Sequence, residues 1–378
     1  MGERKLRKTD VAIGWLEGVG KGVATMFDFT KVSGNGKTEE KKATMLPDAI
    51  SPTMNVRRTA RDIMDGAKHV TIKRDKLEDI VKKEGMKVKL TEWNEGGIHY
   101  LSPTSPEKTA LYVLVLDCMN FCFWPSHNSL LQYHHLSTSL KTLAEASDGE
   151  DEEEESFRFH PKKLAEIEES FFTEELDPLL PPGVTMPSKK ERVHLLRELG
   201  SSLLYRHGGK AMNMIEKSEN SADKLVDIIV RDLPGFRDEA IDLDGRRRFF
   251  YKRAQIAVAD LWAALGRVGM VDFKDIGSLT TFADYRVPQV LRHEGGLEYS
   301  KELAKVVDKM TVLPAGCRME LEIRAATIVA VDEMARKAGV KAVEMDWWIW
   351  QAGERMIEKG EGGKGQILNH HRVRTVYY

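Results

Sequence analysis

From residue 160 almost to the end of the chain, hydrophobic residues recur with the period of an α-helix, and few segments alternate as strands do. Leu195, Leu199, Ser202 and Leu203, for example, define one helical face. Helices are predicted at residues 225–230, 251–265, 303–310, 319–338 and 342–358. Pro234-Gly235 marks a stop after the first of these segments. The periodicity therefore predicts a mainly α-helical fold.

The stretch ALYVLVLDCMNFCFW at residues 110–124 is almost continuously apolar, which predicts that it is buried. Its pattern fits either a strand or a helix, but its length and its lack of turn residues favour a helix. Nearer the N-terminus, apolar spacing predicts helices around residues 55–67 and 77–83. Residues 93–102 contain Gly96-Gly97 followed by a short apolar run, which predicts a short strand or hairpin.

A chain of 378 residues is long enough for a large hydrophobic core in one domain or two. Residues 33–42 read SGNGKTEEKK, which is typical of a flexible linker. We therefore expect residues 1–47 to form a flexible extension and residues 48–378 to form the functional domain. Within the extension, residues 11–27 are mildly amphipathic, so organelle targeting stays open as an alternative. Residues 148–155 read DGEDEEEE, and this block of like charges predicts a disordered acidic insertion.

The charge balance argues against a protein that grips long nucleic acid, because 57 basic and 59 acidic side chains leave a net charge of −2. The three cysteines, Cys118, Cys122 and Cys317, form no C-x-x-C pair and suit a reducing compartment. No apolar run is long enough for a membrane span, and the N-terminus lacks a secretory apolar core. We expect a cytoplasmic location, with the nucleus as an addition, and no membrane partner.

Several catalytic motifs are absent from the sequence: the P-loop, the dinucleotide G-x-G-x-x-G after a strand, H-E-x-x-H and G-x-S-x-G. The pairs His134-His135 and His370-His371 consist of sequence neighbours, whose side chains point in different directions. The sequence therefore predicts neither a metal site nor a bound cofactor.

Two aromatic segments carry polar residues. Asp117 and Asn120 interrupt the apolar run, and Phe121, Phe123 and Trp124 would stack on a base; core packing is the alternative. At residues 249–255, Lys252 and Arg253 begin a predicted helix, where cations are unfavourable. That position indicates an anionic partner, a phosphate or an ionised Asp, unless the two are an ordinary surface pair.

Asp284 lies near an element boundary, because Pro288 disfavours helical conformation at Val287. Catalytic groups are often placed at such boundaries, but a lone Asp before a break marked by proline is more often an N-cap.

Two predicted helices carry carboxylates of interest. Glu320 and Arg324 have the spacing of an exposed ion pair, whereas Glu322 shares a face with apolar residues and is expected to point inward. Asp346 and Trp350 are neighbours on a helix, and an acid beside an indole suggests a heterocycle pocket; tryptophans that merely pack in the core are the alternative.

Together these segments resemble the queuosine salvage protein family, whose members are queuosine 5′-phosphate N-glycosylase/hydrolases. The matching stretches are LDCMNFCFWPS, PGFRDEA, FFYKRAQIAVADLW, LTTFADYRVPQVLRHEGGLEYS, LPAGCRMELEIRAATIVAV, MDWWIWQAGE and HHRVRTVYY. They occur in the family's order over residues 52–378, whereas residues 1–46 and 148–155 fall outside the pattern.

The resemblance implies a helical core similar to that of the helix-hairpin-helix DNA glycosylases, with a hairpin-like stretch at residues 272–282. It also implies that Asp284 is the catalytic carboxylate and that Lys252 lies in the same site. The family's reaction hydrolyses queuosine 5′-monophosphate, a small-molecule nucleotide, to queuine and ribose 5-phosphate, and queuine is then re-inserted into transfer RNA. A carboxylate suits that reaction because the sugar becomes oxocarbenium-like.

The remaining candidates are assigned to substrate binding by motif position and residue type. Phe121, Trp124 and Trp347 would form walls for the base, and Asp346 would bind its polar edge. Arg286, Arg372 and Arg374 would bind the 5′-phosphate, because the guanidinium fork matches phosphate geometry. The other predicted substrate-binding residues are Asn120, Asp238, Tyr285, Glu322 and His371.

Two other functions stay open on the sequence alone. A glycosylase acting on damaged DNA would share the helical core, but the near-neutral charge speaks against it. A non-catalytic factor that binds a nucleotide or transfer RNA would keep the pocket without the reaction, but the presence of both Lys252 and Asp284 weighs against it. We expect no stable nucleic acid partner.

Overall fold

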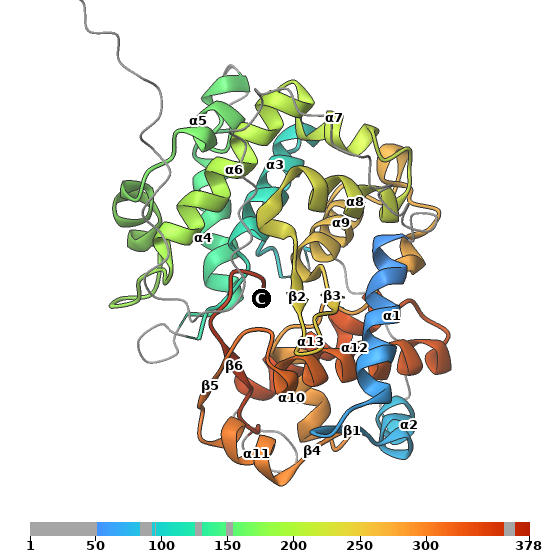
Figure 1. Ribbon diagram of the computed structural model, residues 1–378. Coiled ribbons are helices and arrows are strands. Elements are labelled where there is room, and N and C mark those ends of the chain that lie inside the picture. Colours follow the sequence, from blue (N-terminus) through green and yellow to red (C-terminus); the bar gives the residue numbers. More distant parts are fainter. Residues whose placement is uncertain (1–50, 84–92, 95, 125–130, 149–153, 359–366) are drawn as a thin grey trace, which may run out of the picture. The chain divides into compact units, whose positions relative to one another are not determined.

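A computed structural model describes residues 51–83, 93–94, 96–124, 131–148, 154–358 and 367–378, and helices account for most of them (Figure 1). The α-helices are α1 (Pro52–Asp65), α2 (Arg74–Lys83), α3 (Pro106–Met119), α4 (Tyr133–Glu145), α5 (Pro161–Ala165), α6 (Lys189–His207), α7 (Ala211–Glu216), α8 (Ala222–Asp232), α9 (Lys252–Ala264), α10 (Arg286–His293), α11 (Lys301–Asp308), α12 (Arg318–Ala338) and α13 (Ala342–Glu358). The fold is mainly α, as the periodicity predicts.

Local sequence explains where several helices begin and end. Serine side chains accept a backbone N–H of the first turn at the starts of α1, α3, α8 and α11. Gly208 and Gly339 follow α6 and α12 with φ angles of 62° and 70°, a left-handed conformation that glycine adopts without steric penalty.

Two hydrophobic cores organise the described chain. The first surrounds α3, which is buried along its whole length, and includes the apolar faces of α4, α6, α8 and α9. The second lies among α2, α10, α11 and α13. Helix α12 contributes to both, with Leu321 and Ala325 in the first core and Ile323 and Ala326 in the second. Figure 1 shows these groups as the upper and lower parts of the view, with the C-terminus between them.

The strands are short and pair only two by two. Strand β1 (Val70–Ile72) pairs with β4 (Leu297–Tyr299) and β2 (Glu239–Ile241) pairs with β3 (Arg247–Phe249), both antiparallel, whereas β5 (Val312–Leu313) and β6 (Arg372–Val373) are parallel. The β2–β3 hairpin matters for the site, because Asp238 precedes β2 and the chain leads from β3 directly into α9.

The predicted strand or hairpin at residues 93–102 is wrong for the residues described there. Gly96 and Gly97 have φ angles of 85° and 66°, which bend the backbone into a turn. The N–H of His99 donates to Asn94 Oδ1 at 2.9 Å, and the His99 ring stacks on Trp93 at 4.0 Å. Both contacts lie within residues 93–99, so they stabilise the turn without a partner strand.

The ends of the predicted acidic insertion have defined positions. Asp148 forms a buried ion pair with Lys108 at 2.5 Å, and Glu154 begins a 3-10 helix at Glu154–Ser156. Within the predicted insertion, residues 149–153 lie outside the described residues. The predicted flexible extension at residues 1–47 also lies outside them. The hairpin-like stretch at 272–282 contains a 3-10 turn at Ile276–Ser278, and its likeness to a helix-hairpin-helix stays a prediction.

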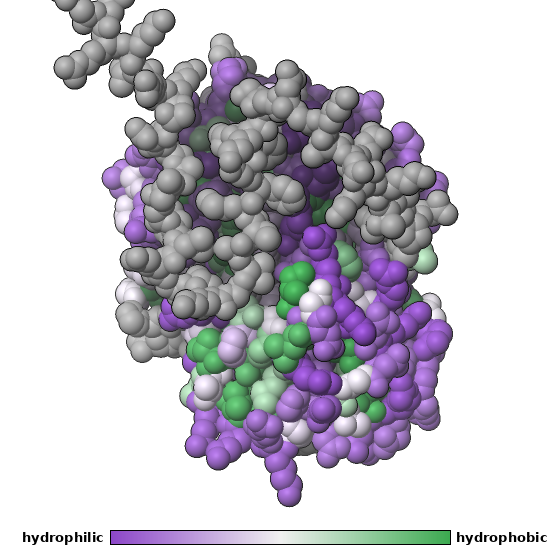
Figure 2. Space-filling model, viewed as in Figure 1, coloured by the Kyte–Doolittle hydropathy of each residue, from purple (hydrophilic) through white to green (hydrophobic). Residues whose placement is uncertain are grey.

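None of the described helices is both long and apolar enough to cross a bilayer. Across the same residues, no group of three or more His, Cys, Asp or Glu side chains is arranged to hold a metal ion. Figure 2 shows hydrophobic side chains gathered over the lower part of the view, beside a mostly hydrophilic surface. Met310, Val312 and Leu368 are among the exposed hydrophobic residues of the β5–β6 region.

Candidate active site

A cavity of about 490 Å³ lies where the two hydrophobic cores meet. Helix α9 contributes one wall and α13 another, and the segments after α3 and before α10 complete it. The predicted site residues that line this cavity are Asn120, Phe121, Lys252, Asp284, Tyr285, Arg286, Asp346 and Trp347. Segments separated by more than two hundred residues in the sequence therefore meet in one place.

Lys252 is the first residue of α9 and is only 4% exposed. Its amino group lies 3.4 Å from the carbonyl oxygen of Asn120. Burial lowers the pKa of Lys252, while the negative charges of Asp284 and Asp117 oppose that shift. Carboxylates of the protein itself are therefore among the anionic groups near this helix start.

Asp284 caps a helix and lines the cavity at the same time. Its Oδ1 accepts the backbone N–H groups of Arg286 at 2.8 Å and Val287 at 3.0 Å, which are otherwise unpaired at the start of α10. Its Oδ2 accepts no hydrogen bond from the described residues and is therefore available for a ligand. The N-cap and the catalytic interpretation of the sequence are thus compatible.

Asp346 of α13 is buried beneath the loop that leads to Asp284. Its Oδ1 accepts hydrogen bonds from the Thr281 hydroxyl and from the Phe282 N–H, the latter at 2.8 Å. Burial raises the pKa of Asp346 to about 7, although these two donors favour the ionised form. Asp346 is therefore poised to change charge near neutral pH.

Three buried cations fix the segment that carries Asn120 and Phe121. Arg253 donates to the carbonyls of residues 117 and 118, Arg192 to those of 119 and 121, and Lys252 to that of 120. These carbonyls belong to the end of α3, where a helix leaves its last C=O groups unpaired and its dipole attracts cations. This clamp, formed by Arg192, Lys252 and Arg253, holds the Phe121 ring against the Arg192 guanidinium at 4.1 Å.

Aromatic rings form much of the remaining wall. Trp347 stacks on Trp262 with ring centres 6.3 Å apart, and Trp350 meets Tyr133 edge to face at 5.4 Å. Such walls suit a planar heterocycle, because aromatic rings stack on its faces.

Two further buried carboxylates, Asp117 and Asp260, interact electrostatically with Lys252. Asp260 of α9 lines the cavity, and burial together with the charge of Asp117 raises its pKa well above the usual range. Asp117 is fully buried, and neither of its oxygens has a hydrogen-bond partner among the described residues, although the Asn120 side chain favours its charged form. Burial raises the pKa of Asp117 to about 7.

Six of the predicted site residues lie outside the cavity lining. Arg372 and Arg374 pack over the ring of Trp124 at 5.3 and 6.0 Å, so these three residues form a separate group near the C-terminus. His371 is buried near the Tyr378 ring, and burial lowers its pKa to about 3.

The two glutamates of α12 have structural roles. Glu322 is buried as predicted, but its Oε2 accepts the N–H groups of Lys68, His69 and Val70 at 2.9, 2.5 and 3.2 Å. It therefore anchors the chain before β1 instead of binding substrate. Glu320 and Arg324 form the predicted ion pair at 3.6 Å, but the predicted exposure of this pair is wrong, because both side chains are buried. Arg324 also binds Asp238. Asp238 itself does not line the cavity.

Several lining residues were not predicted from the sequence, although helical spacing connects them to residues that were. Starting from Lys252, steps of four residues lead along α9 to Ile256 and Asp260, which also line the cavity. The same step from Asp346 leads through Trp350, which the sequence already suggested for a heterocycle pocket, to Glu354, and from Trp347 to Gln351 and Arg355. His99 and Tyr133 also line the cavity, but no regular spacing links them to the predicted residues.

Comparison with known proteins matches residues 98–378 to the family described as "Queuosine salvage protein". Three similar proteins are each named queuosine 5′-phosphate N-glycosylase/hydrolase. That of Dictyostelium discoideum is 36% identical over 345 residues, covering 87% of this chain and all of the relative. That of Sphaerobacter thermophilus is 34% identical over 339 residues, with 86% and 98% covered. That of Mus musculus is 30% identical over 353 residues, with 87% and 100% covered.

Proposed function

Given that the chain belongs to the queuosine salvage protein family, we propose that it hydrolyses the N-glycosidic bond of queuosine 5′-monophosphate, releasing queuine and ribose 5-phosphate for the salvage of queuine into transfer RNA. The observation that carries the proposal is the presence of Asp284 and Lys252 in the lining of one aromatic cavity. The relatives' shared name supplies the substrate, and the cavity supplies side chains suited to its chemistry.

The reaction breaks the bond between the sugar C1′ and the base nitrogen, and water supplies a hydroxyl to C1′ and a proton to the base. Positive charge develops on the sugar as this bond breaks, so a nearby carboxylate lowers the barrier. We assign that role to Asp284, whose Oδ2 has no hydrogen bond from the described residues. Lys252 lines the same cavity, where the negative charge of Asp284 favours its charged form, and it is placed to donate a hydrogen bond there.

Base recognition is assigned to the walls of the cavity. Phe121 and Trp347 would stack on the base, and the Asp346 carboxylate would accept hydrogen bonds from its N–H groups. Asp346 still has an oxygen for this purpose, because its two protein donors both bind Oδ1. Trp124 is no longer part of this proposal, since it does not line the cavity.

Of the three arginines predicted for the phosphate, only Arg286 lines the cavity, and Glu354 and Gln289 orient its guanidinium at 2.8 and 2.6 Å. Arg355 also lines the cavity, is exposed, and has no ion-pair partner among the described residues. We therefore assign the 5′-phosphate to Arg286 and Arg355, and no longer to Arg372 or Arg374.

The test is release of queuine from queuosine 5′-monophosphate, followed by chromatography, for wild type and Asp284→Asn. Asparagine keeps an Oδ1 that can accept the N–H groups of Arg286 and Val287, so this variant removes the charge and preserves the cap. We expect turnover by wild type and binding without turnover by Asp284→Asn. Binding of the nucleotide without base release by wild type would instead indicate a non-catalytic nucleotide-binding protein.

A further inference from the structure

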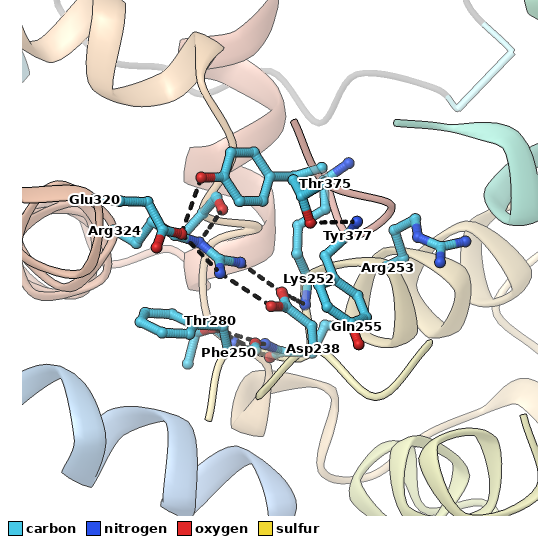
Figure 3. A network of polar contacts seen from close by, with 12 residues as sticks. Asp238, Phe250, Lys252, Arg253, Gln255, Thr280, Glu320, Arg324, Thr375 and Tyr377 are labelled. Atoms are coloured by element: carbon cyan, nitrogen blue, oxygen red, sulfur yellow. Dashed lines mark hydrogen bonds and ion pairs between the residues drawn. The ribbon is translucent and has the colours of Figure 1, made fainter. Parts of the chain in front are cut away.

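A buried ion pair behind the cavity connects the two segments that carry Lys252 and Asp284. Arg324 of α12 and Asp238 in the loop before β2 are 2% exposed each. The guanidinium binds the carboxylate in a two-pronged arrangement, with Nη1–Oδ1 at 3.0 Å and Nη2–Oδ2 at 2.5 Å (Figure 3). Neither residue lines the cavity, so neither is placed to touch a ligand there.

Asp238 holds the turn that introduces Lys252. Its Oδ2 accepts the backbone N–H of Lys252 at 3.1 Å, and its carbonyl accepts those of Phe250 and Tyr251 at 3.0 and 3.2 Å. Tyr251 has a φ of 50°, a left-handed conformation that is unfavourable for any residue with a side chain. The surrounding bonds must therefore maintain this turn, and it directs the first residue of α9 into the cavity.

Arg324 holds the other segment. Its Nε donates to the carbonyl oxygen of Ala283 at 3.1 Å, and Ala283 directly precedes Asp284. The same planar guanidinium thus binds the Asp238 carboxylate and the peptide group before Asp284. A rigid fork with several fixed donors can maintain both contacts at once, whereas a lysine ammonium at the end of a flexible chain cannot.

The surroundings of Arg324 restrict its orientation further. The rings of Phe250 and Tyr378 lie 4.0 and 4.4 Å from its guanidinium carbon. Glu320 approaches Nη1 at 3.6 Å, and the Tyr378 hydroxyl donates to Glu320 at 2.9 Å. Figure 3 shows Arg324 between Glu320 and Asp238, with Lys252 next to Asp238.

We propose that Asp238 and Arg324 are positioning residues that set the placement of the Lys252 amino group relative to the Asp284 carboxylate. This inference rests on the proposed function and assigns Asp238 a different role from substrate binding. The ion pair acts through backbone contacts, at Lys252 N–H on one side and at the carbonyl of Ala283 on the other. Displacing a reacting group by about 1 Å lowers catalysis on the order of 100-fold, so a small shift at either end has a large effect.

The experiment compares kcat, KM and thermal stability for wild type, Asp238→Asn, Arg324→Lys and the double variant, with queuosine 5′-monophosphate as substrate. We expect each single variant to lose kcat by roughly 100-fold while KM stays near the wild-type value, because neither substituted residue lines the cavity. We expect the double variant to be no worse than either single variant, since the two residues act as one unit. Additive losses, or losses confined to KM, would overturn the proposal.

A matched control is the buried pair of Lys108 and Asp148, with side chains 9% and 8% exposed and a separation of 2.5 Å. It lies at the start of α3 and does not line the cavity. Lys108→Met breaks a pair of similar burial, so it should lower thermal stability but leave kcat unchanged. An equal loss of kcat in Lys108→Met would show that Asp238 and Arg324 matter only for general stability.

Crystal structures of wild type and Arg324→Lys test the positioning role without any substrate. A shift of the Asp284 carboxylate relative to the Lys252 amino group supports the proposal, even if wild type fails to release queuine and the proposed function is rejected. An unchanged arrangement of these two groups rejects the positioning role, even if wild type turns over.

Discussion

At the scale of single residues, Asp284 joins a structural and a chemical task in one side chain. Oδ1 closes the start of α10, and the carboxylate also lines the cavity. The cap fixes the carboxylate through two backbone donors, so its position does not depend on a flexible side-chain partner. The helix start thereby supplies the rigidity that a catalytic carboxylate needs.

Alanine and asparagine at position 284 should separate these tasks. Asp284→Ala removes the cap as well as the charge and should destabilise the protein by about 1 kcal/mol, whereas Asp284→Asn should stay close to wild type in stability. Both variants should lose turnover. Denaturant titration measures the stabilities, and equal stability of the two variants would contradict the capping role.

Asp346 should give substrate binding a pH dependence near neutrality. Burial raises its pKa to about 7, so the carboxylate is largely protonated below pH 7 and ionised above it. The ionised form accepts hydrogen bonds from the base, and KM should therefore rise as the pH falls through 7. In Asp346→Asn, KM should be high and the same on both sides of pH 7. A wild-type pH dependence retained in this variant would assign the titration to another group, such as Asp117 or Asp260.

The phosphate assignment can be tested with two arginines of different placement. Arg355→Ala should raise KM for the 5′-monophosphate and leave KM for the unphosphorylated nucleoside unchanged, because Arg355 lines the cavity without a described ion-pair partner. Arg372→Ala should change neither value, since Arg372 packs over Trp124 outside the lining. If Arg372→Ala instead raised KM for the nucleotide alone, the phosphate would be assigned to the group of Trp124, Arg372 and Arg374.

At the scale of elements, close contact between α10 and α13 fixes the orientation of Arg286. A Cβ added at Gly353 of α13 would lie 2.7 Å from Val290 and 3.0 Å from Arg286 Cδ, both on α10. Gly353→Ala should therefore displace Arg286 and raise KM for the nucleotide, while the better helix propensity of alanine, about 1 kcal/mol, offsets part of the strain.

Gly200→Ala is the matched control for this contact. A Cβ at Gly200 would lie 2.4 Å from the backbone nitrogen of Ala165, in the packing of α5 on α6 away from the cavity. This variant should lose roughly 1–3 kcal/mol of stability and keep a normal KM. Thermal melts measure the stability of both variants, and Michaelis curves measure their KM. An unchanged KM in Gly353→Ala would contradict the role of the contact between α10 and α13.

At the scale of the whole molecule, periodicity predicted the helices well because their apolar faces pack on one core or the other. Helices α9, α12 and α13 begin and end within a residue or two of their predicted bounds. Tertiary context explains the failures. Glu320 and Arg324 have the spacing of a surface pair, but Tyr378, far away in sequence, covers them. The clamp on the end of α3 likewise depends on Arg192 and Arg253 from two other helices, which no local pattern links.

The cavity lining was predicted only in part, again because local sequence patterns do not contain the tertiary contacts. Lys252, Asp284 and Asp346 were predicted because each lies in a stretch that carries the resemblance to the family, and all three line the cavity. The terminal HHRVRTVYY stretch carries the same resemblance, but it contributes Tyr378 to the lining and none of its arginines. The position of a residue in such a stretch therefore does not show whether its side chain lines the cavity or only supports the fold.

The buried carboxylates near Lys252 should make the stability of the whole protein depend on pH, and Asp117, which does not line the cavity, offers the clearest test. Its folded pKa is raised to about 7 by burial, against an ordinary value of 3.8. Below the unfolded pKa both states are protonated and folding carries no penalty. As the pH rises towards 7 the unfolded state ionises first, so stability is lost, and above 7 the loss is constant.

Asp117→Asn keeps this position neutral at every pH. It should therefore be more stable than wild type by a few kcal/mol at pH 8, on the order of the cited shift, and the difference should vanish near pH 3. Asp148→Asn should show the opposite sign: burial opposes ionisation of Asp148, but hydrogen bonds from Lys108, Tyr100 and Ser102 lower its pKa. That variant should be less stable than wild type at pH 8 and converge with it in acid. Urea titrations from pH 3 to 8 measure both differences, and a stability gain in Asp117→Asn that stays the same in acid would show that burial of this charge is not its source.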